Sequence, residues 1–306
     1  VRESALSALK AMGTACAVHA SDVASHLGNS NSDVRACVLA ALASMGLAAT
    51  EHGGAAVALH LGNPDRDTRA DALRALTRMG ALAAEHAGAA VALHLANPDT
   101  DIRVDASRAL AAMGAAAAEH AGADVALHLA NPDGHIRADA LRALAAMGAA
   151  AAEHARAVAL HLGSPSIDIS ACALQTLMAM GPAAANRAGA TVALQLANPD
   201  SDIRAHALRS LEAMGPAAAE HAIAVAARLV EEDVRICDLA WSVLEAMGPE
   251  AAKCPGAEVS AHLGHRSFGA LLATRRAVGD PSLSSQVFKS GLLVATARSG
   301  DDDHKL

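Results

Sequence analysis

The sequence has almost no aromatic residues: Trp241, Phe268 and Phe288 are the only three among 306, and there is no tyrosine. An aromatic cage, a base-stacking groove or a groove for polyproline segments needs rings that this chain lacks. A core of this size would ordinarily use aromatic side chains as its large fillers. Because 53% of the residues are hydrophobic, the core must instead be built from Ala, Leu, Val and Met, which requires closely approaching helices.

Positive charge is the second shortage. The chain carries 24 basic against 32 acidic residues, for a net charge of −8. This balance argues against a protein that binds polyanions, so the sequence predicts protein partners and no nucleic acid. The longest uncharged run, residues 169–186, contains polar side chains and a Gly181-Pro182 break, and it therefore predicts no membrane span.

Cysteines are few and scattered, at Cys16, Cys37, Cys172, Cys237 and Cys254. Their number is odd and no pair has the C-x-x-C spacing. We expect reduced thiols rather than a disulfide framework or a zinc site, which favours a reducing intracellular compartment, either the cytoplasm or an organelle interior. The chain begins inside a repeat, so we expect further residues upstream, where a targeting segment would lie.

What the chain has in abundance is an internal repeat. The dipeptide Met-Gly recurs every 33 or 34 residues, with its methionine at Met12, Met45, Met79, Met113, Met147, Met180, Met214 and Met247. A marker arginine recurs in phase with it, at Arg2, Arg35, Arg69, Arg103, Arg137, Arg204 and Arg235. Ser170 takes this position in the sixth copy. Eight copies, numbered here by their Met-Gly, predict a tandem array.

Each copy reads as two helices. In the fourth copy, the Ala-rich residues 82–96 are long enough for about four helical turns. Asn97-Pro98-Asp99 ends this first helix, because proline cannot continue it. Asp99 is placed to cap a second helix, and a left-handed Gly114 would close that helix.

The second helix is amphipathic. Its apolar face carries Ile102, Ala106, Ala109 and Met113 at helical spacing, whereas Asp105 and Arg108 lie off that face. A single pair of helices cannot bury such a stripe, but stacked pairs can. The pattern therefore predicts an α-solenoid.

Two other repeats of similar period fit less well. The tetratricopeptide pattern needs aromatic residues at fixed positions, and they are absent. The ankyrin signature is similar to residues 126–130 and Gly134-His135. However, ankyrin places a turn-rich hairpin between its units, where this chain has residues 114–121, which read as helix.

The second helix resembles that of HEAT-like repeats. The resemblance rests on Asp101-Ile102-Arg103 through Ala109-Leu110 and on Asp202-Ile203-Arg204 through Leu211. It covers roughly residues 1–263, and the short unit is similar to the subclass found in phycobilisome lyases. The resemblance implies an all-α, right-handed α-solenoid of about eight two-helix repeats with period 33–34, plus a C-terminal cap and tail.

The end of the chain departs from the pattern. Two residues are inserted between Arg235 and Met247, and the preceding loop is shorter. Residues 249–279 predict one more first helix and a degenerate second helix, which would form the end cap that an array needs. We therefore expect a solenoid over residues 1–279 and a tail or docking arm over residues 280–306.

The marker arginine follows an aspartate in most copies. The resemblance implies that such pairs form a ladder that ties neighbouring loops together. A catalytic role would single out one copy, so recurrence in nearly every copy predicts a structural role.

Histidine recurs in two sets. One set follows glutamate, at His52, His86, His120, His154 and His221; the other comprises His26, His60, His94, His128, His161 and His262. The HEAT-like deoxyhypusine hydroxylases bind a di-iron centre through His-Glu pairs, but here the order is Glu-His, and adjacent helical residues point apart. Neighbouring helices lie about 8–10 Å apart, too far for equivalent histidines to share a metal. We expect surface or inter-repeat hydrogen-bonding histidines, no metal and no cofactor.

The candidate binding site is a second arginine series, called here the arginine row: Arg74, Arg108, Arg142 and Arg209. The first three have an aspartate three residues earlier, at Asp71, Asp105 and Asp139; His206 stands there before Arg209, and Cys37 and Cys172 hold the position in two other copies. The spacing predicts ion pairs on an exposed helix face. That face is either a self-neutralised solvated surface or a partner-binding surface, and arginine is favoured at interface hot spots.

The sequence has no Gly-rich phosphate loop, no Ser-His-Asp order and no zinc spacing. We therefore predict no enzyme, but a non-catalytic protein-binding scaffold or accessory subunit of a larger assembly that binds along the solenoid surface. The resemblances leave two alternatives. One is a lyase-like or chaperone-like accessory of tetrapyrrole or light-harvesting proteins, and the other is a di-iron hydroxylase-like HEAT enzyme.

Overall fold

The computed structural model describes residues 2–46, 48–231, 233–248 and 251. Within these ranges the regular secondary structure is helical, with no strand, which confirms the predicted all-α fold. The chain divides into two compact units, Val1–Val158 and Ala159–Leu306, called here unit 1 and unit 2. Apart from Ala251, the predicted cap and tail lie outside the described residues.

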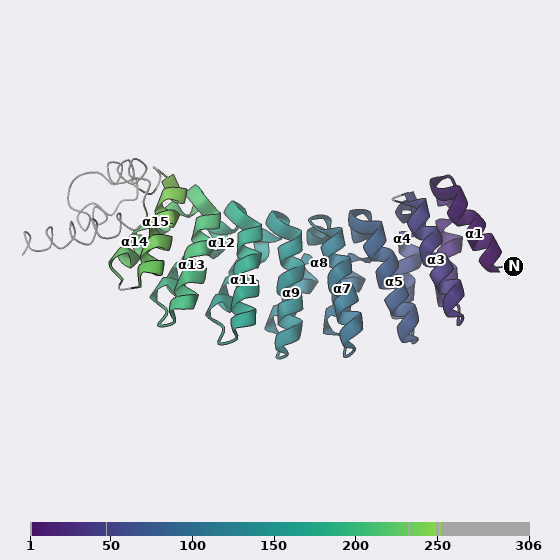
Figure 1. The fold of residues 1–306 in the computed structure, drawn as a ribbon, viewed down its shortest axis with the longest axis horizontal. Helices are drawn as coiled ribbons and strands as arrows, with labels where there is room; N and C mark the ends of the chain where they lie inside the picture. The colour runs from purple at the N-terminus through teal and green to yellow at the C-terminus, as the bar shows by residue number, and fades with distance from the viewer. Residues whose placement is uncertain (1, 47, 232, 249–250, 252–306) are drawn as a thin grey trace, which may run out of the picture. The chain divides into compact units, whose positions relative to one another are not determined.

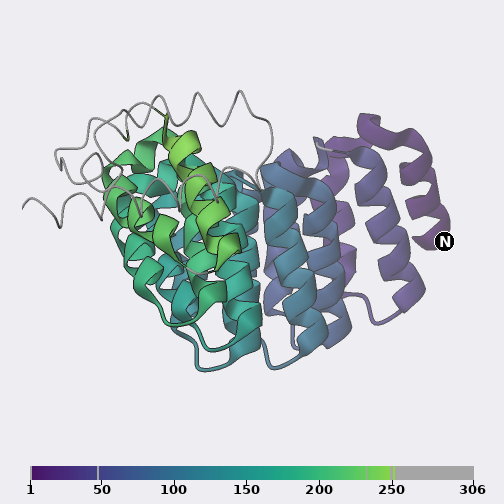
Figure 2. The same cartoon turned by 60° about the vertical axis from the view of Figure 1, so that its left-hand side comes forward.

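Unit 1 contains two layers of helices (Figure 1, Figure 2). One layer holds the second helices of the copies: α1 (Arg2–Met12), α3 (Ser32–Met45), α5 (Arg66–Met79), α7 (Thr100–Met113) and α9 (Gly134–Met147). The other holds the first helices: α2 (Ala20–Ser25), α4 (Ala48–Leu59), α6 (Ala84–Leu93), α8 (Ala116–Leu127) and α10 (Ala155–Ala159), which ends at the unit boundary. Each second helix contacts the next second helix.

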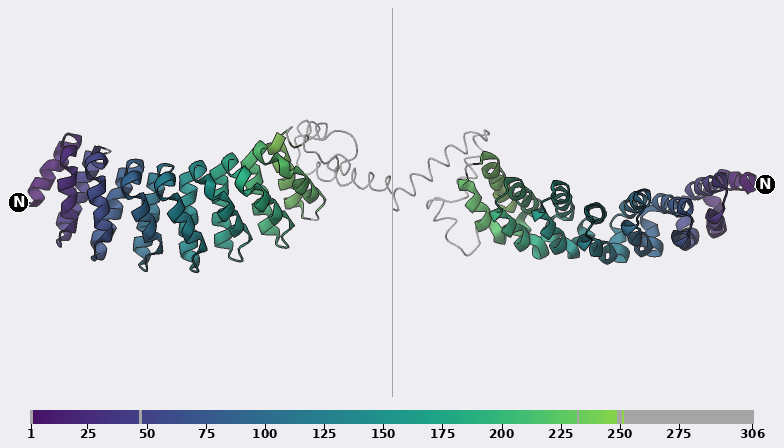
Figure 3. Two further views of the ribbon diagram at one scale, coloured as in Figure 1. Left: turned by 180° about the vertical axis from the view of Figure 1, so that it is seen from behind. Right: turned by 90° about the horizontal axis from the view of Figure 1, so that it is seen from below.

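Unit 2 repeats this arrangement (Figure 3). Its second helices are α11 (Ile167–Met180), α13 (Ser201–Met214) and α15 (Val234–Met247), and its first helices are α12 (Ala185–Leu194) and α14 (Ala222–Ala226). α13 contacts both α11 and α15, and α12 packs against α13. Both units therefore have the predicted two helices per copy.

The core of both units is aliphatic. Ile102, Ala106, Ala109 and Met113 are all buried, as their spacing predicts. Asp99 caps α7, since its carboxylate accepts hydrogen bonds from the backbone N–H groups of Asp101 and Ile102.

The glycine of each Met-Gly closes the second helix with a positive φ of 55–65°. The prediction of a left-handed helical conformation is wrong in one respect, because Gly114 has φ 56° and ψ −136°. That region is open essentially only to glycine, because it has no Cβ. The conformation turns the chain directly into the next first helix.

The one-residue difference in length between 33- and 34-residue copies lies in their first helices. The shorter copies begin their first helix with seven 3-10 residues, at Gly13–His19, Gly148–His154 and Gly215–His221. The 34-residue copy between Met79 and Met113 instead has only Gly80–Ala83 in 3-10 form, followed by the longer α6. A 3-10 residue rises about 2.0 Å against about 1.5 Å for an α residue, so both kinds of segment span about 29 Å. A lost residue is compensated by tighter winding, and the stack stays in register.

The eighth copy differs from the sequence prediction. α15 has 14 residues, the same length as α13, and Asp233 caps it as Asp200 caps α13. The helix therefore contains no insertion, and the marker position of this copy is held by Cys237, not by Arg235. The Sγ of Cys237 lies 3.1 Å from the carbonyl oxygen of Glu231, in the loop that the marker arginine contacts in other copies.

Candidate functional site

The marker arginines close the loop of their own copy. In α7, Nη1 of Arg103 donates to the carbonyl oxygens of Asn97 (2.9 Å) and Pro98 (3.2 Å). Arg35, Arg69, Arg137 and Arg204 make the same contacts. These carbonyls follow the end of the first helix, where the backbone lacks helical partners and a positive charge is favourable. The contact is structural.

The aspartates of the candidate site are not on an exposed face, so that prediction is wrong. Asp71, Asp105 and Asp139 are buried, with 6–8% of each residue exposed. Their arginine neighbours are exposed: the side chains of Arg74, Arg108 and Arg142 keep 55%, 69% and 54% of their surface. The hydrophobic pattern of a single helix does not predict this burial, because a neighbouring helix, and not solvent, lies beside each aspartate.

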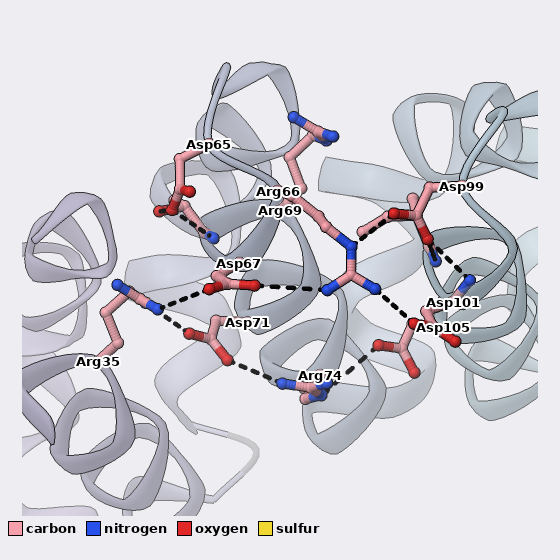
Figure 4. A network of polar contacts seen from close by, with 12 residues as sticks. Arg35, Asp65, Arg66, Asp67, Arg69, Asp71, Arg74, Asp99, Asp101 and Asp105 are labelled. Atoms are coloured by element: carbon pink, nitrogen blue, oxygen red, sulfur yellow. Dashed lines mark hydrogen bonds and ion pairs between the residues drawn. The ribbon is translucent and has the colours of Figure 1, made fainter. Parts of the chain in front are cut away.

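Each buried aspartate lies between arginines of two copies (Figure 4). Asp71 accepts from Nε of Arg35 at 2.8 Å and from Nη1 of Arg74 at 3.1 Å. Nε of Arg74 in turn lies 3.5 Å from Oδ2 of Asp105, whose other oxygen accepts from Nη1 of Arg108 at 3.3 Å. The alternating charges join α3, α5 and α7.

The same arrangement recurs at α9. Asp139 accepts from Nη2 of Arg142 at 2.5 Å, and Nε of Arg103 lies 4.0 Å from its other oxygen. For Arg35 and Arg103, the nearest acid is the buried aspartate of the next copy, Asp71 or Asp139. The position of these buried aspartates in the second helix is called here the inner position. The aspartate before the marker arginine plays a lesser part, since Asp67 lies 3.7 Å from Arg35.

An exposed network also links the loops of unit 1, and Asp67 joins it to the buried pairs because it lies near both Arg35 and Arg66 (Figure 4). Arg66 donates to Asp99 at 2.5 Å and also binds Asp101. The hydrogen bond from Arg66 lowers the pKa of the Asp99 carboxyl, and the same bond raises the pKa of Arg66. In unit 2, Arg235 makes the corresponding contact with Asp202 at 2.8 Å.

The geometry of unit 1 presents arginine donors to solvent while it buries the matching acids. A guanidinium has five N–H donors, and the hydrogen bond from Arg108 to Asp105 uses one nitrogen. The anchored side chain is therefore oriented and still able to bind a carboxylate through its other N–H groups.

Unit 2 does not continue this arrangement. Arg209 is exposed on α13, with His206 in place of the aspartate. Burial lowers the pKa of His206, and the nearby positive charge of Arg209 lowers it further. On α11, Gln175 stands at the arginine position, and the half-buried Cys172 at the aspartate position. The structure thus assembles three of the four predicted arginines within one unit.

His94 and His128 of the second histidine set link neighbouring copies, as predicted, and His262 lies outside the described residues. Nε2 of His94 lies 3.1 Å from the carbonyl oxygen of Leu61, and Nε2 of His128 lies 3.1 Å from that of Ala92. Burial lowers the pKa of His94, and Arg69 also lowers it.

The Glu-His set lies apart from any ligand cluster. His86 and His120 are exposed, and the ring of His154 lies 3.5 Å from its own neighbour Glu153. In the part of the chain that the structure describes, no three His, Cys, Asp or Glu side chains converge as metal ligands would. Over the same residues, no helix has the length and apolar character that a bilayer crossing needs.

One recurring surface feature was not predicted from the sequence. Leu59, Leu93, Leu127, Leu160 and Leu194 occupy one position of the first helix in five consecutive copies, and all five are exposed. The signal was present in the repeated Ala-Leu-His-Leu, where the helical period cannot assign both leucines to one buried face.

No family model and no curated protein matches this chain. Solved structures do. Importin beta has a TM-score of 0.52 and 15% identity over 89% of this chain and 41% of its own length. A designed armadillo repeat protein in complex with the peptide (KR)4 has a TM-score of 0.46 and 13% identity, over 63% of this chain and 99% of its own. A HEAT-like repeats protein from Thermococcus onnurineus NA1 has a TM-score of 0.43 and 14% identity, over 69% and 94%.

The chain spans about two fifths of importin beta. At such identity the likeness shows the fold alone. The fold is the one that the sequence predicts: an all-α solenoid of HEAT-like repeats.

Proposed function

We propose that the chain is a non-catalytic protein-binding scaffold or accessory subunit, and that Arg74, Arg108 and Arg142 contact carboxylate groups of a protein partner. Arg209 would add a contact on unit 2. Asp71, Asp105 and Asp139 act as positioning residues that hold the arginines from behind.

One observation carries this proposal: three consecutive second helices bury the acid and expose the base of each ion pair. A fully solvated pair would place both groups in water and would orient neither. Here the carboxylate fixes the guanidinium, so less conformational entropy is lost when a second carboxylate binds.

A protein fits this surface better than a nucleic acid. Arg74, Arg108 and Arg142 each have an aspartate within 3.3 Å, and the whole chain carries a charge of −8. A polyanion would gain little from such a balanced surface. Individual carboxylates on a partner can bind the oriented N–H groups at short range, where net charge matters less.

The test is quantitative capture of partners by the immobilised full chain from its source lysate, followed by mass spectrometry. Arg108→Glu/Arg142→Glu should lower recovery of a stoichiometric partner at least about tenfold, because each lost charge-assisted contact contributes about 1.5–3 kcal/mol. Arg108→Gln/Arg142→Gln should also weaken capture while leaving Asp105 and Asp139 a hydrogen-bond donor, which guards against a folding defect.

The matched control is Arg156→Glu/Arg187→Glu, which makes the same charge change at exposed positions on first helices. Equal loss in this control would assign the effect to general charge, and undiminished capture by both row variants would remove the row from the function. Metal and absorbance measurements on the same sample test the alternatives. About two irons per chain would support the hydroxylase, and bound pigment would support the tetrapyrrole accessory.

A further inference from the structure

The first helices carry a row of exposed leucines on the layer opposite to the arginines. In unit 1 the leucine row comprises Leu59, Leu93 and Leu127, which are 81%, 68% and 73% exposed. In unit 2 it comprises Leu160 and Leu194, at 65% and 75%. Exposed leucines scattered singly are ordinary, but one position repeated in five copies is not scattered.

The core does not need these leucines. The leucine two residues later in each copy fills the core, and Leu61, Leu95 and Leu129 are all at most 3% exposed. The helix does not need them either, because the second and eighth copies place Ser25 and Ala227 at the same position. The row therefore begins and ends inside the array.

The surroundings of the row are mostly small. In unit 1 the residue four positions earlier is an exposed alanine, at Ala55, Ala89 and Ala123. The residue three positions later is exposed Gly62, Ala96 or Ala130. Two charged residues lie beside the row, Asp124 three residues before Leu127 and Arg156 four residues before Leu160. Each leucine of unit 1 thus projects from a surface of mostly small side chains.

We propose that the leucine row is the interface of a homodimer, and that its occupant is the same row on a second copy of this chain. A second copy has the same distance between successive leucines, so the leucine side chains of one row can pack between those of the other. A two-fold axis makes such a self-complementary contact closed and finite.

The area is compatible with this proposal. Burying one leucine side chain removes on the order of 100 Å² of apolar surface. Three leucines from unit 1 therefore give about 300 Å² of the roughly 800 Å² per partner in a standard interface. The small residues beside them extend the patch within unit 1. The net charge of −8 on each copy opposes association, and salt screens that repulsion.

The test is the molar mass of the purified full chain by light scattering and sedimentation velocity over a range of concentrations. The wild type should be a dimer that becomes tighter as salt rises, whereas a complex formed through the arginine row should weaken. Leu59→Glu/Leu93→Glu/Leu127→Glu should be a monomer with wild-type helicity and a cooperative melt. Leu82→Glu, an exposed leucine of unit 1 off the row, should remain a dimer.

A mixture of the triple Glu variant with Leu59→Lys/Leu93→Lys/Leu127→Lys should form a heterodimer, because opposite charges then meet whichever leucines oppose one another. A monomeric wild type at all concentrations overturns the proposal. So does a dimer that the Glu variant leaves intact, or a mixture that stays monomeric. These outcomes are independent of partner capture by the arginines, which the row variants should retain.

Discussion

The second helices from α3 to α15 have 14 residues in both units, yet they differ at one inner position. In unit 1 that position holds Asp71, Asp105 and Asp139, which are buried between arginines, and Cys37 in α3. In unit 2, α11 has Cys172 there and α13 has His206. Because helices stack in both units, stacking does not require the acid. The charged pairs of unit 1 are an addition to a fold that aliphatic packing already supports.

The marker position differs between α7 of unit 1 and α11 of unit 2. The long guanidinium of Arg103 reaches both the loop carbonyls and the next copy, and Arg204 of unit 2 does the same, with Glu231 of the next copy at 3.1 Å. On α11, Ser170 instead donates to the carbonyl oxygen of Ile167 at 3.1 Å, within its own helix. The departure is therefore confined to this copy, where Ile167 and Met178 are exposed.

The largest expected effect on stability comes from removing one inner aspartate from unit 1. Asp71→Ala should lower the free energy of unfolding by about 3 kcal/mol, because it leaves the buried guanidinium of Arg35 without the carboxylate that accepts from its Nε at 2.8 Å. Cys172→Ala, at the same position in unit 2, should change it by less than about 1 kcal/mol. Urea unfolding followed by circular dichroism checks both values.

The fluorescence of Trp241, the one tryptophan, reports on unit 2 and serves as the internal control. Asp71→Ala should leave the midpoint of that signal nearly unchanged. Similar losses from the two alanine variants would mean that the inner position has the same role in both units, and the comparison would fail.

Exchanging the marker residues is the second test. Arg103→Ser should destabilise by about 1–2 kcal/mol, since the loop carbonyls lose a charged donor. Ser170→Arg should give no matching gain, because the next copy offers His206 where Asp139 stands opposite Arg103. A stabilisation by Ser170→Arg comparable to the loss in Arg103→Ser would show that the loop contact alone, without the acid, explains the marker arginine.

The sequence predicted the fold well because its strongest signals are local. Met113, Gly114, Pro98 and Asp99 each act within their own copy, and the Met-Gly pair recurs eight times. The sequence predicted the turn conformation of Gly114 only in part, because it indicates a positive φ but not the value of ψ.

The candidate site was only partly predictable. The i, i+3 pairs of Asp105 with Arg108 follow from helical geometry, but the burial of Asp105 depends on how closely α5 approaches α7. No periodicity within one helix contains that distance. The sequence placed the marker position of the eighth copy at Arg235, because the loop before it is shorter than in the other copies. The structure places it at Cys237, because the helix begins after the cap at Asp233.

The smallest expected effect concerns pH, and it separates a copy with histidine at this position from one without it. His94 in unit 1 donates from Nε2 to Leu61 and lies with Nδ1 3.3 Å from Nδ2 of Asn97, whereas the copy of unit 2 that contains α12 has Gln195 at this position, where it accepts a hydrogen bond from Asn198. Because burial lowers the pKa of His94 below its unfolded value, its contribution to stability is fully present above about pH 6.5. It is lost as pH falls through the lower, folded pKa. His94→Gln should therefore flatten the acid side of the stability profile by about 0.5 kcal/mol, the lower end for one net hydrogen bond. Hydrogen exchange of unit 1 peptides between pH 5 and 7.5 measures it, with Gln195→His as the converse variant, which should introduce the same slope into unit 2; a profile that neither variant alters would assign the acid sensitivity to other groups.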